Sequence, residues 1–435
     1  MNKSDAERIT KVLEKMGFVQ TNNEEDAEVL GLVACSVRQK SVNKVYGRIE
    51  KWNKFKKDKK IVTFLTGCVL DDDKLKLEKL FDLVFKINEL PKLDMLLSSY
   101  IKKIKTFQTN LSLKQKNFDA DFWKIVPKYS SSFQAYVPIQ NGCNKFCTFC
   151  AVPYTRGREI SRSSDEILNE VRYLVNNGYK TITLLGQNVN SYGRDKKGEE
   201  INFVQLLQKI GEFGNNTARQ FWIYYTSPHP SDMTKEVLEV MAQYPCLARH
   251  VHLPIQSGDN DILKKMNRSY NISQYRKIIK NINELLPQAT IFTDIIVGFP
   301  TETRQQFENT KKAMKEFNFN MVYLACYSPR PQAVSSRWGD DITLQEKKSR
   351  FNELTEDLKK IALENNKKMI GKVCKVLIEG IARKENYLSA RTEGLIPCRF
   401  LCEDRSLVGE FAEIMIESVT PFAASGKFIK VSLET

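Results

Sequence analysis

The sequence is poor in histidine and has no long apolar run. Its 435 residues include three histidines, against ten cysteines and 52 Asp and Glu residues. A metal site with several ligands must therefore rely on cysteine or carboxylate side chains. No apolar run reaches the roughly 18 residues of a membrane-spanning helix, and the N-terminal segment lacks the apolar stretch of a signal peptide. These absences argue against a membrane protein and predict a cytoplasmic location.

Positive charge is in excess and is concentrated in one segment. The chain carries 67 Lys and Arg against 52 Asp and Glu, a formal net charge of +15. This balance favours a polyanionic partner such as nucleic acid. Positions 36–60 hold ten basic residues and two acids, whereas the part from Gly371 onward holds nine of each. Positions 36–60 are therefore a candidate RNA contact, and the alternative is the solvated face of a Lys-rich helix.

The length predicts two or three domains, and the pattern predicts an α/β fold class. The first domain, 1–105, alternates helical patterns with buried strands at 28–34 and 61–66, which end at Cys35 and Cys68. Doubly wound α/β sheets place their ligands just beyond the carboxyl ends of strands. We therefore predict a doubly wound N-terminal domain with two cysteines at its ligand-binding edge.

Two further domains follow a stretch without periodicity at 106–132, which we interpret as a linker. Over 129–365, six strand patterns alternate with mostly helical ones, which predicts a partial (βα)6 TIM-like barrel with its function on the loops after the strands. The predicted strands are 133–139, 181–185, 221–226, 250–253, 291–297 and 321–327. Over 368–434, short β runs predict a small all-β, OB-like barrel, a class that commonly binds oligonucleotides.

Three cysteines, Cys143, Cys147 and Cys150, follow directly after the first strand of the predicted central barrel. In a cytosolic chain such a group favours metal ligation or catalysis over disulfides. Crowded thiolates suit a soft metal, and three ligands to a four-iron cubane leave one iron free to bind another molecule. A structural zinc site needs a fourth ligand, and no histidine occurs within the next seventy residues. A redox pair or a chance cluster is the remaining alternative.

Longer strings around these cysteines resemble a known family. The loop is GCNKFCTFCAVPYTRGREISR at 142–162, and its spacing with Phe149 before the last cysteine looks like the radical SAM superfamily. Together with CSVRQKS at 35–41, LLGQNVNSYG at 184–193, HLPIQSGDNDILKKMNR at 252–268 and TDIIVGFPTET at 293–303, it is similar to the MiaB-type tRNA methylthiotransferases. The match covers nearly the whole chain. In that family the three domains are a methylthiotransferase domain, a radical SAM barrel and an RNA-binding TRAM domain.

The resemblance implies that Cys143, Cys147 and Cys150 are catalytic and hold a [4Fe–4S] cluster, whose open iron binds S-adenosylmethionine. Phe149 would pack near the adenine of this cofactor, and Gly186 and Gln187 would meet its methionine moiety. Alternatively, Gln187 is a loop residue that satisfies backbone groups. Glu302 is expected in the first turn of the helix after Pro300, where the helix dipole favours an acid.

The resemblance also implies a second [4Fe–4S] cluster in the N-terminal domain, which carries the sulfur and methyl group to be transferred. Cys35 and Cys68 match two of its three ligands, although a free cysteine is often only a small buried hydrophobe. The other five cysteines match no motif of the family, and we interpret them as structural. They are Cys246, Cys326, Cys374, Cys398 and Cys402.

The implied activity is methylthiolation of C-2 of isopentenyladenosine next to the tRNA anticodon, because VPYTRGRE and GQNVNSYG resemble the MiaB branch most closely. Alternatives are methylthiolation of threonylcarbamoyladenosine in tRNA, methylthiolation of a ribosomal-protein aspartate, and tRNA binding without catalysis. Expected partners are tRNA, S-adenosylmethionine, an electron donor and a sulfur donor. We expect a monomer that does not bind membranes.

The start of the N-terminal domain is unusual for this family, whose members carry a strand ending in Gly-Cys just before a segment like MNKSDAERI. Here no strand pattern precedes the first helix. We therefore expect the apolar face of Ile9, Val12, Leu13 and Met16 to be poorly covered, and the third ligand of the second cluster to lie upstream of Met1. A start site placed too late explains this better than a true truncation.

Overall fold

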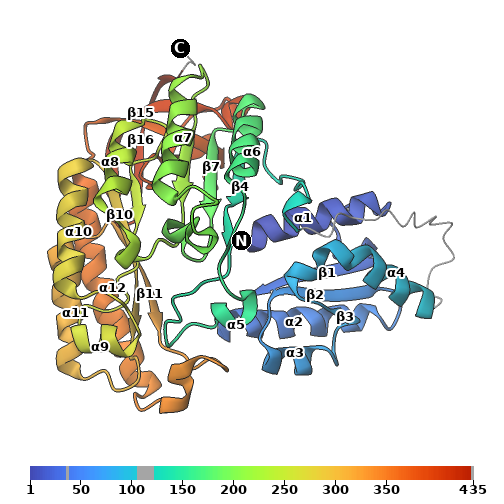
Figure 1. Cartoon of the computed structure of the whole chain (residues 1–435). Helices are drawn as coiled ribbons and strands as arrows, with labels where there is room; N and C mark the ends of the chain where they lie inside the picture. The colour runs from blue at the N-terminus through green and yellow to red at the C-terminus, as the bar shows by residue number, and fades with distance from the viewer. Residues whose placement is uncertain (36–38, 105–121, 433–435) are drawn as a thin grey trace.

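The computed structural model describes residues 1–35, 39–104 and 122–432, which form three units in chain order (Figure 1). An α/β unit at the N-terminus lies beside a central barrel of alternating strands and helices, and a small β-barrel follows at the C-terminus. Within these ranges, none of the helices combines the length and apolarity needed to cross a bilayer.

The N-terminal unit is a three-stranded parallel sheet, in the order β1-β2-β3, with helices on both faces. Strand β2 is buried along its whole length, as expected for a parallel strand covered on two sides. The doubly wound prediction is confirmed. Its elements are α1 (Asn2–Lys15), β1 (Val29–Cys35), α2 (Gln39–Phe55), β2 (Val62–Cys68), α3 (Asp71–Leu77), β3 (Leu83–Val84) and α4 (Leu93–Ile104).

Helix α1 is well covered in this structure. Its side chains Ile9 and Val12 are 4% and 0% exposed, and they pack with Val62 and Phe64 of β2 and with the apolar side of α4. The expectation of a poorly covered apolar face is therefore wrong. The physical reason is that α4 folds back over the same face of the sheet and supplies the missing apolar surface.

The central unit contains the six predicted parallel strands, arranged as two three-stranded sheets, β4-β7-β8 and β9-β10-β11. A parallel bridge between Ile223 and Leu247 links β8 to the segment before β9. The strands are β4 (Gln134–Pro138), β7 (Thr181–Leu185), β8 (Trp222–Tyr225), β9 (His250–His252), β10 (Thr290–Val297) and β11 (Met321–Cys326). The main helices are α6 (Ser164–Asn176), α7 (Phe203–Asn215), α8 (Lys235–Gln243), α10 (Ile272–Leu285), α11 (Arg304–Phe317) and α12 (Leu344–Lys367).

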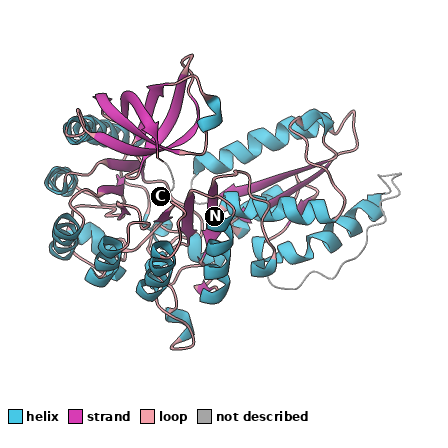
Figure 2. Ribbon diagram, turned by 90° about the horizontal axis from the view of Figure 1, so that it is seen from above, coloured by secondary structure: helices cyan, strands magenta, loops and turns pink. Residues whose placement is uncertain are grey.

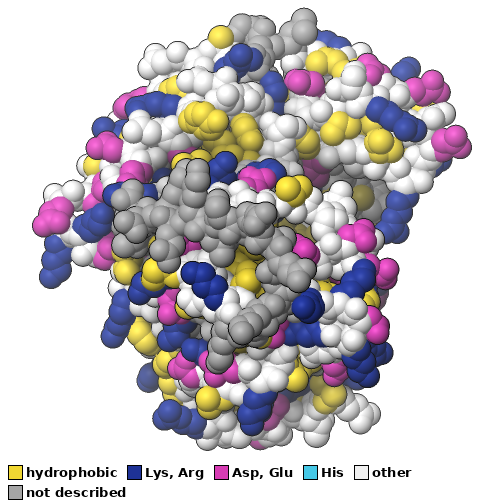
Figure 3. Space-filling model, turned by 90° about the vertical axis from the view of Figure 1, so that its right-hand side faces the viewer, with side chains coloured by type: hydrophobic (Ala, Val, Ile, Leu, Met, Phe, Trp, Pro, Cys, Tyr) yellow, Lys and Arg dark blue, Asp and Glu magenta, His cyan; other side chains and the backbone are white. Residues whose placement is uncertain are grey.

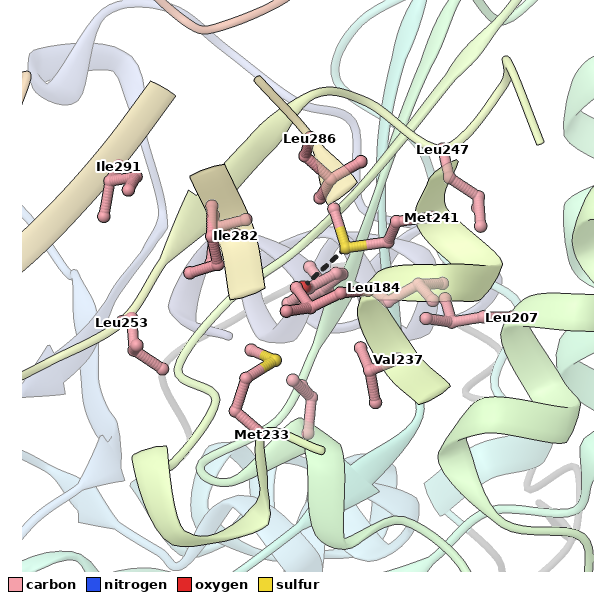
Figure 4. Close-up of a cluster of buried hydrophobic side chains, with 14 of the residues drawn as sticks. Leu184, Leu207, Met233, Val237, Met241, Leu247, Leu253, Ile282, Leu286 and Ile291 are labelled. Carbon is pink, nitrogen blue, oxygen red and sulfur yellow. Dashed lines mark hydrogen bonds between the residues drawn. The ribbon is translucent and has the colours of Figure 1, made fainter. Parts of the chain in front are cut away.

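Apolar side chains from these helices and strands form the largest core of the molecule. Figure 4 shows part of it, where Val237 and Met241 of α8 lie near Leu184 of β7 and Ile282 of α10. The Tyr225 hydroxyl donates to the Met241 sulfur at 3.0 Å, so the polar end of a buried tyrosine is satisfied inside this core.

The C-terminal unit is a closed five-stranded β-barrel, in the order β12-β13-β14-β16-β15, and its alternating side chains enclose a separate apolar core. The predicted small all-β barrel is confirmed. Cys374, Cys398 and Cys402 pack in or against that core. Its strands are β12 (Val373–Ile381), β13 (Tyr387–Thr392), β14 (Pro397–Leu401), β15 (Phe411–Thr420) and β16 (Ala423–Val431).

The β-barrel caps the amino ends of the central strands (Figures 1 and 2). Trp222, the first residue of β8, stacks edge-on against Phe411 with ring centroids 4.6 Å apart. The Gln134 amide, at the start of β4, donates to Glu379 at 2.9 Å, and the Thr290 hydroxyl donates to the Gly394 carbonyl at 2.7 Å. The loops at the carboxyl ends of the central strands therefore lie at the opposite end from the β-barrel.

Glu302 is not in the first turn of a helix, because α11 begins at Arg304 with Thr303 as its N-cap. The side chain of Glu302 is 1% exposed and accepts from the Gly298 backbone N–H at 2.7 Å and from Arg350 of α12 at 2.8 Å. The helix-dipole prediction is wrong, because Glu302 precedes the helix and its carboxylate instead contacts Arg350 and the Gly298 N–H.

Candidate active site

The loop with Cys143, Cys147 and Cys150 crosses the carboxyl ends of the central strands. It begins after β4 and the short strand β5 (Gln140–Asn141) and ends at α5 (Val152–Arg156). Its three cysteines are half-buried free thiols. Gly142 has a φ of +81°, and a Cβ there would lie 2.0 Å from the Arg158 carbonyl oxygen, so only glycine fits this entry to the loop.

Neighbouring loops hold the cysteine loop at several points. The Gly142 N–H donates to Gln187 Oε1 at 2.5 Å, from the loop after β7, and the Lys145 ammonium contacts Asp232 at 2.7 Å, from the loop after β8. The Asn267 amide, after α9 (Asn260–Lys265), donates to the carbonyls of residues 145 and 146 at 3.1 and 3.0 Å. The thiols are thus held by the barrel scaffold and not by the loop alone.

Burial raises the pKa of Cys143 to about 11, and burial followed by the nearby Cys147 raises the pKa of Cys150 to about 12. The sulfurs are therefore close enough to oppose one another's ionisation. A guanidinium faces the group, since Arg268 Nη1 donates to the Cys147 sulfur at 3.4 Å. Three soft sulfur donors beside a fixed cation fit a thiolate-bound iron–sulfur cluster, in which each thiolate binds a different iron.

No group of three or more His, Cys, Asp or Glu side chains is arranged to hold a single metal ion within the described ranges. The assignment of a cluster to Cys143, Cys147 and Cys150 rests on the donor chemistry of their three thiols.

The structure places the three remaining predicted cofactor residues around this loop. Phe149 is half-buried against Met266, Phe299 and other apolar side chains. Gly186 follows β7, and a Cβ there would lie 3.0 Å from Val189. Gln187 holds the backbone of Gly142, which agrees with the alternative interpretation of this residue as a loop-satisfying amide. Contact of these residues with S-adenosylmethionine stays a prediction.

His229 lies near Lys145 of the cysteine loop and near Arg268, which contacts that loop, and sequence reasoning did not single out this histidine. It is buried in the loop after β8, and its Nδ1 accepts from the Ser231 backbone N–H at 3.2 Å. Burial, with Arg268 and Lys145 nearby, lowers the pKa of His229 to about 2, so the ring is neutral. Its Nε2 has no partner among the described residues. The sequence signal that could have identified His229 is its place in the string SPHP, directly after the strand predicted over 221–226.

Cys35 and Cys68 meet at the edge of the N-terminal sheet, as the sequence predicted. They are paired in register across β1 and β2, at the last position of each strand. Burial raises the pKa of the Cys68 thiol, and Arg156 opposes this, because its Nε donates to the sulfur at 2.9 Å. Two adjacent thiols with a counter-cation form part of a soft-metal site. Residues 36–38 of the predicted CSVRQKS motif lie outside the described residues.

A cavity of about 520 Å³ lies inside the central barrel, between its strands and the C-terminal β-barrel. Aromatic rings line much of it, including Tyr136, Tyr224, Phe292 and Tyr323. The lining also includes Arg391, whose Nε lies 2.8 Å from the Glu379 carboxylate. The size and the aromatic lining suit a planar base with an apolar substituent.

Comparisons with known proteins agree with this arrangement. The model of the radical SAM superfamily matches residues 137–314, and that of the uncharacterized protein family UPF0004 matches residues 1–87. The tRNA-2-methylthio-N(6)-dimethylallyladenosine synthase of Clostridium botulinum (strain Langeland) is 34% identical over 436 residues, covering 99% of this chain and 95% of the relative. The enzyme of that name from Dictyoglomus thermophilum is 36% identical over 438 residues, covering 99% and 96%.

Solved structures show more distant likeness. The radical S-adenosylmethionine methyltransferase TsrM from Kitasatospora setae, with tryptophan substrate and a SAM analog bound, gives a TM-score of 0.49 at 12% identity. The alignment covers 75% of this chain and 66% of that one.

Proposed function

Because the chain belongs to the family of tRNA-2-methylthio-N(6)-dimethylallyladenosine synthases, we propose that it places a methylthio group on C-2 of N6-dimethylallyladenosine beside the tRNA anticodon. The observation that carries this proposal is the cysteine loop held across the carboxyl ends of the central strands by contacts from the neighbouring loops. Radical SAM chemistry needs such a fixed loop, because the cofactor's reactive carbon must be held against the substrate.

Cys143, Cys147 and Cys150 would hold a [4Fe–4S] cluster, which when bound supplies the electron for reductive cleavage of S-adenosylmethionine. The chain's own part is to orient and to exclude water. Lys145 and Gln187 fix the cysteine loop to the barrel, and Phe149 covers one side of it with apolar surface. We assign Phe149, Gly186 and Gln187 to the surroundings of the cofactor.

We assign Cys35 and Cys68 to a second [4Fe–4S] cluster, as two of its ligands. Their register across β1 and β2 and the nearby guanidinium of Arg156 support this assignment. Each turnover adds one sulfur to the product, so a sulfur donor must replace it, and an electron donor must reduce the first cluster. We propose that the chain works as a cytoplasmic monomer with these donors.

The lining of the cavity between the central strands and the β-barrel suits an apolar substituent better than the carboxylate of the threonylcarbamoyl alternative. Arg391 is already paired with Glu379, and burial lowers the pKa of His250 to about 3, so this ring is neutral. The third basic lining residue, His252, lies 2.6 Å from Asp294. Among the residues that line the cavity, a substituent carboxylate would therefore find no unpaired cation, whereas a dimethylallyl group would meet aromatic rings.

Mass spectrometry of tRNA nucleosides tests the proposed function. Reduced, iron-reconstituted protein with S-adenosylmethionine and sulfide should convert dimethylallyladenosine in tRNA to its 2-methylthio form, and should leave threonylcarbamoyladenosine tRNA unchanged. Methylthiolation of the second tRNA alone would overturn the choice of substrate. Absence of 5′-deoxyadenosine under reducing conditions would indicate a tRNA-binding protein without catalysis.

We assign tRNA binding to the β-barrel unit, 368–434, and to the basic segment of the N-terminal unit, 36–60. Figure 3 views the molecule from the side of the N-terminal unit and shows Lys and Arg side chains interspersed with Asp and Glu. Several basic residues of the segment have acidic partners, as Arg48 and Lys51 do with Glu24 and Lys56 does with Asp82. Such paired charges contribute less to phosphate binding than free ones.

Lys54, Lys57 and Lys60 are the sharper test of RNA binding, because they are exposed and form no ion pair with the described residues. Changing all three to Glu should weaken tRNA binding and lower the slope of log affinity against log salt by roughly one unit per lost phosphate contact. Filter binding between low and high salt measures both quantities.

The matched control carries the same charge change on the outer helices of the central unit, at the exposed Lys209, Lys277 and Lys312. If both triple variants weaken binding equally, the effect is one of net charge and the segment is not a contact. An unchanged affinity and slope in the first variant would identify a solvated face.

A further inference from the structure

Arg156 joins the two cysteine sites. It is the last residue of α5, the five-residue helix that begins two residues after Cys150. Its guanidinium leaves the central unit and enters the N-terminal unit, where it donates to Asp5 at 2.6 Å and to the Cys68 sulfur at 2.9 Å. A third hydrogen bond, to the side-chain oxygen Oδ1 of Asn141 at 3.2 Å, connects the guanidinium to the segment before Cys143.

This guanidinium is sealed from solvent. The side chains of Arg156 and Asp5 are 2% and 0% exposed. A guanidinium is not deprotonated in proteins, and here it is paired with the Asp5 carboxylate, so its charge is retained. The fork of donors therefore brings one permanent positive charge to the sulfur of Cys68, at the sheet edge where Cys35 is its neighbour.

A purely structural latch would need only the ion pair with Asp5. Here the guanidinium also donates its Nε–H to the sulfur of Cys68, which the proposed function assigns to the second cluster. By contrast, the buried guanidinium of Arg350 donates to Glu346 and Glu302, with no thiol among these hydrogen-bond partners. The planar fork is what allows Asp5 and Cys68 to be bonded at once, because a lysine ammonium lacks this fixed geometry.

We propose that Arg156 is a positioning residue that fixes the Cys35–Cys68 edge against the Cys143–Cys150 loop and stabilises a metal-bound thiolate at Cys68. The proposal rests on the proposed function. Fixing the two sites keeps the group to be transferred near the place where S-adenosylmethionine is cleaved. Loss of Arg156 should therefore separate cleavage from transfer, because the cysteine loop itself is held by Lys145, Gln187 and Asn267.

The first measurement compares two products in Arg156→Gln. 5′-Deoxyadenosine formation should stay near the unsubstituted level, while methylthiolated nucleoside per 5′-deoxyadenosine should fall by about 10- to 100-fold, the usual effect of removing a group that orients a metal ligand. Arg156→Lys, which keeps the charge but loses the fork, should recover only part of the ratio. Asp5→Asn, which leaves Arg156 in place, should lower the ratio less than Arg156→Gln.

The second measurement does not depend on activity. In the Cys143→Ala, Cys147→Ala, Cys150→Ala background only the second cluster can bind, and its electron paramagnetic resonance spectrum and iron content report its surroundings. Arg156→Gln should change the spectrum or lower the iron affinity, whereas the matched control Arg350→Gln, another buried guanidinium, should change neither. Comparison at equal folded fraction, from circular dichroism, removes the effect of lost stability.

An unchanged product ratio together with an unchanged spectrum in Arg156→Gln would overturn the proposal. If Arg156→Gln does not fold, Arg156→Lys and Asp5→Asn provide the test. An unchanged product ratio in both of these variants would then overturn the proposal. Failure of the proposed function is distinguishable, because the unsubstituted protein would then form no methylthiolated nucleoside.

Discussion

Alanine at Cys143, Cys147 and Cys150 together is expected to abolish cleavage of S-adenosylmethionine. The three thiols come from one loop, and Arg268 beside Cys147 is the cation that would balance their charge on metal binding. Without thiolates, a four-iron cluster has no protein anchors at this site. Anaerobically reconstituted variant should lose one cluster's iron and its brown absorption, and 5′-deoxyadenosine should fall below detection.

The control for loss of thiols is the double variant Cys374→Ala, Cys402→Ala in the β-barrel, where both residues pack against an apolar core. It should keep its iron and its cleavage rate. Stoichiometric zinc in place of iron in the unsubstituted protein would contradict the cluster assignment, as would cleavage that survives in the triple-alanine variant.

The sequence predicts the fold well because each element carries a local signal. The six central strands are bounded by turn residues, and the alternation of strand and helix fixes a parallel sheet before any contact is known. The radical SAM and methylthiotransferase resemblance, read from five short motifs, is confirmed by relatives that cover nearly the whole chain. Motifs of this kind are local in sequence, which is why they can be recognised without a structure.

The parts of the site that could not be predicted are contacts between distant segments. Lys145 pairs with Asp232, which is 87 residues away in the sequence, and Arg156 pairs with Asp5, which is 151 residues away. The identity of a residue does not indicate which distant residue it will contact. Glu302 shows how a local rule fails, because Arg350 of α12 approaches it from 48 residues away. A prediction from the helix dipole cannot include a partner that only the tertiary fold supplies.

The last prediction concerns Cys35 and Cys68, whose joint replacement by alanine is expected to separate cleavage from sulfur transfer completely. The cysteine loop of the central unit keeps its contacts with the loops after β7 and β8, and Arg156 keeps its ion pair with Asp5. 5′-Deoxyadenosine formation should therefore stay within about twofold of the unsubstituted rate, because the first cluster retains all three ligands.

Methylthiolated nucleoside should be absent from the same reactions, because the thiols that we assign to the second cluster are gone. Alanine replaces a small buried side chain at Cys68, so folding should be little affected, and Cys246→Ala provides a matched control for removal of a buried thiol. Iron bound at the Cys35–Cys68 edge should be lost from the double variant, and the control should keep all of its iron. If the double variant still methylthiolates tRNA at a tenth of the normal rate or more, Cys35 and Cys68 are only buried hydrophobes. Transfer would then have to be assigned to the central unit alone.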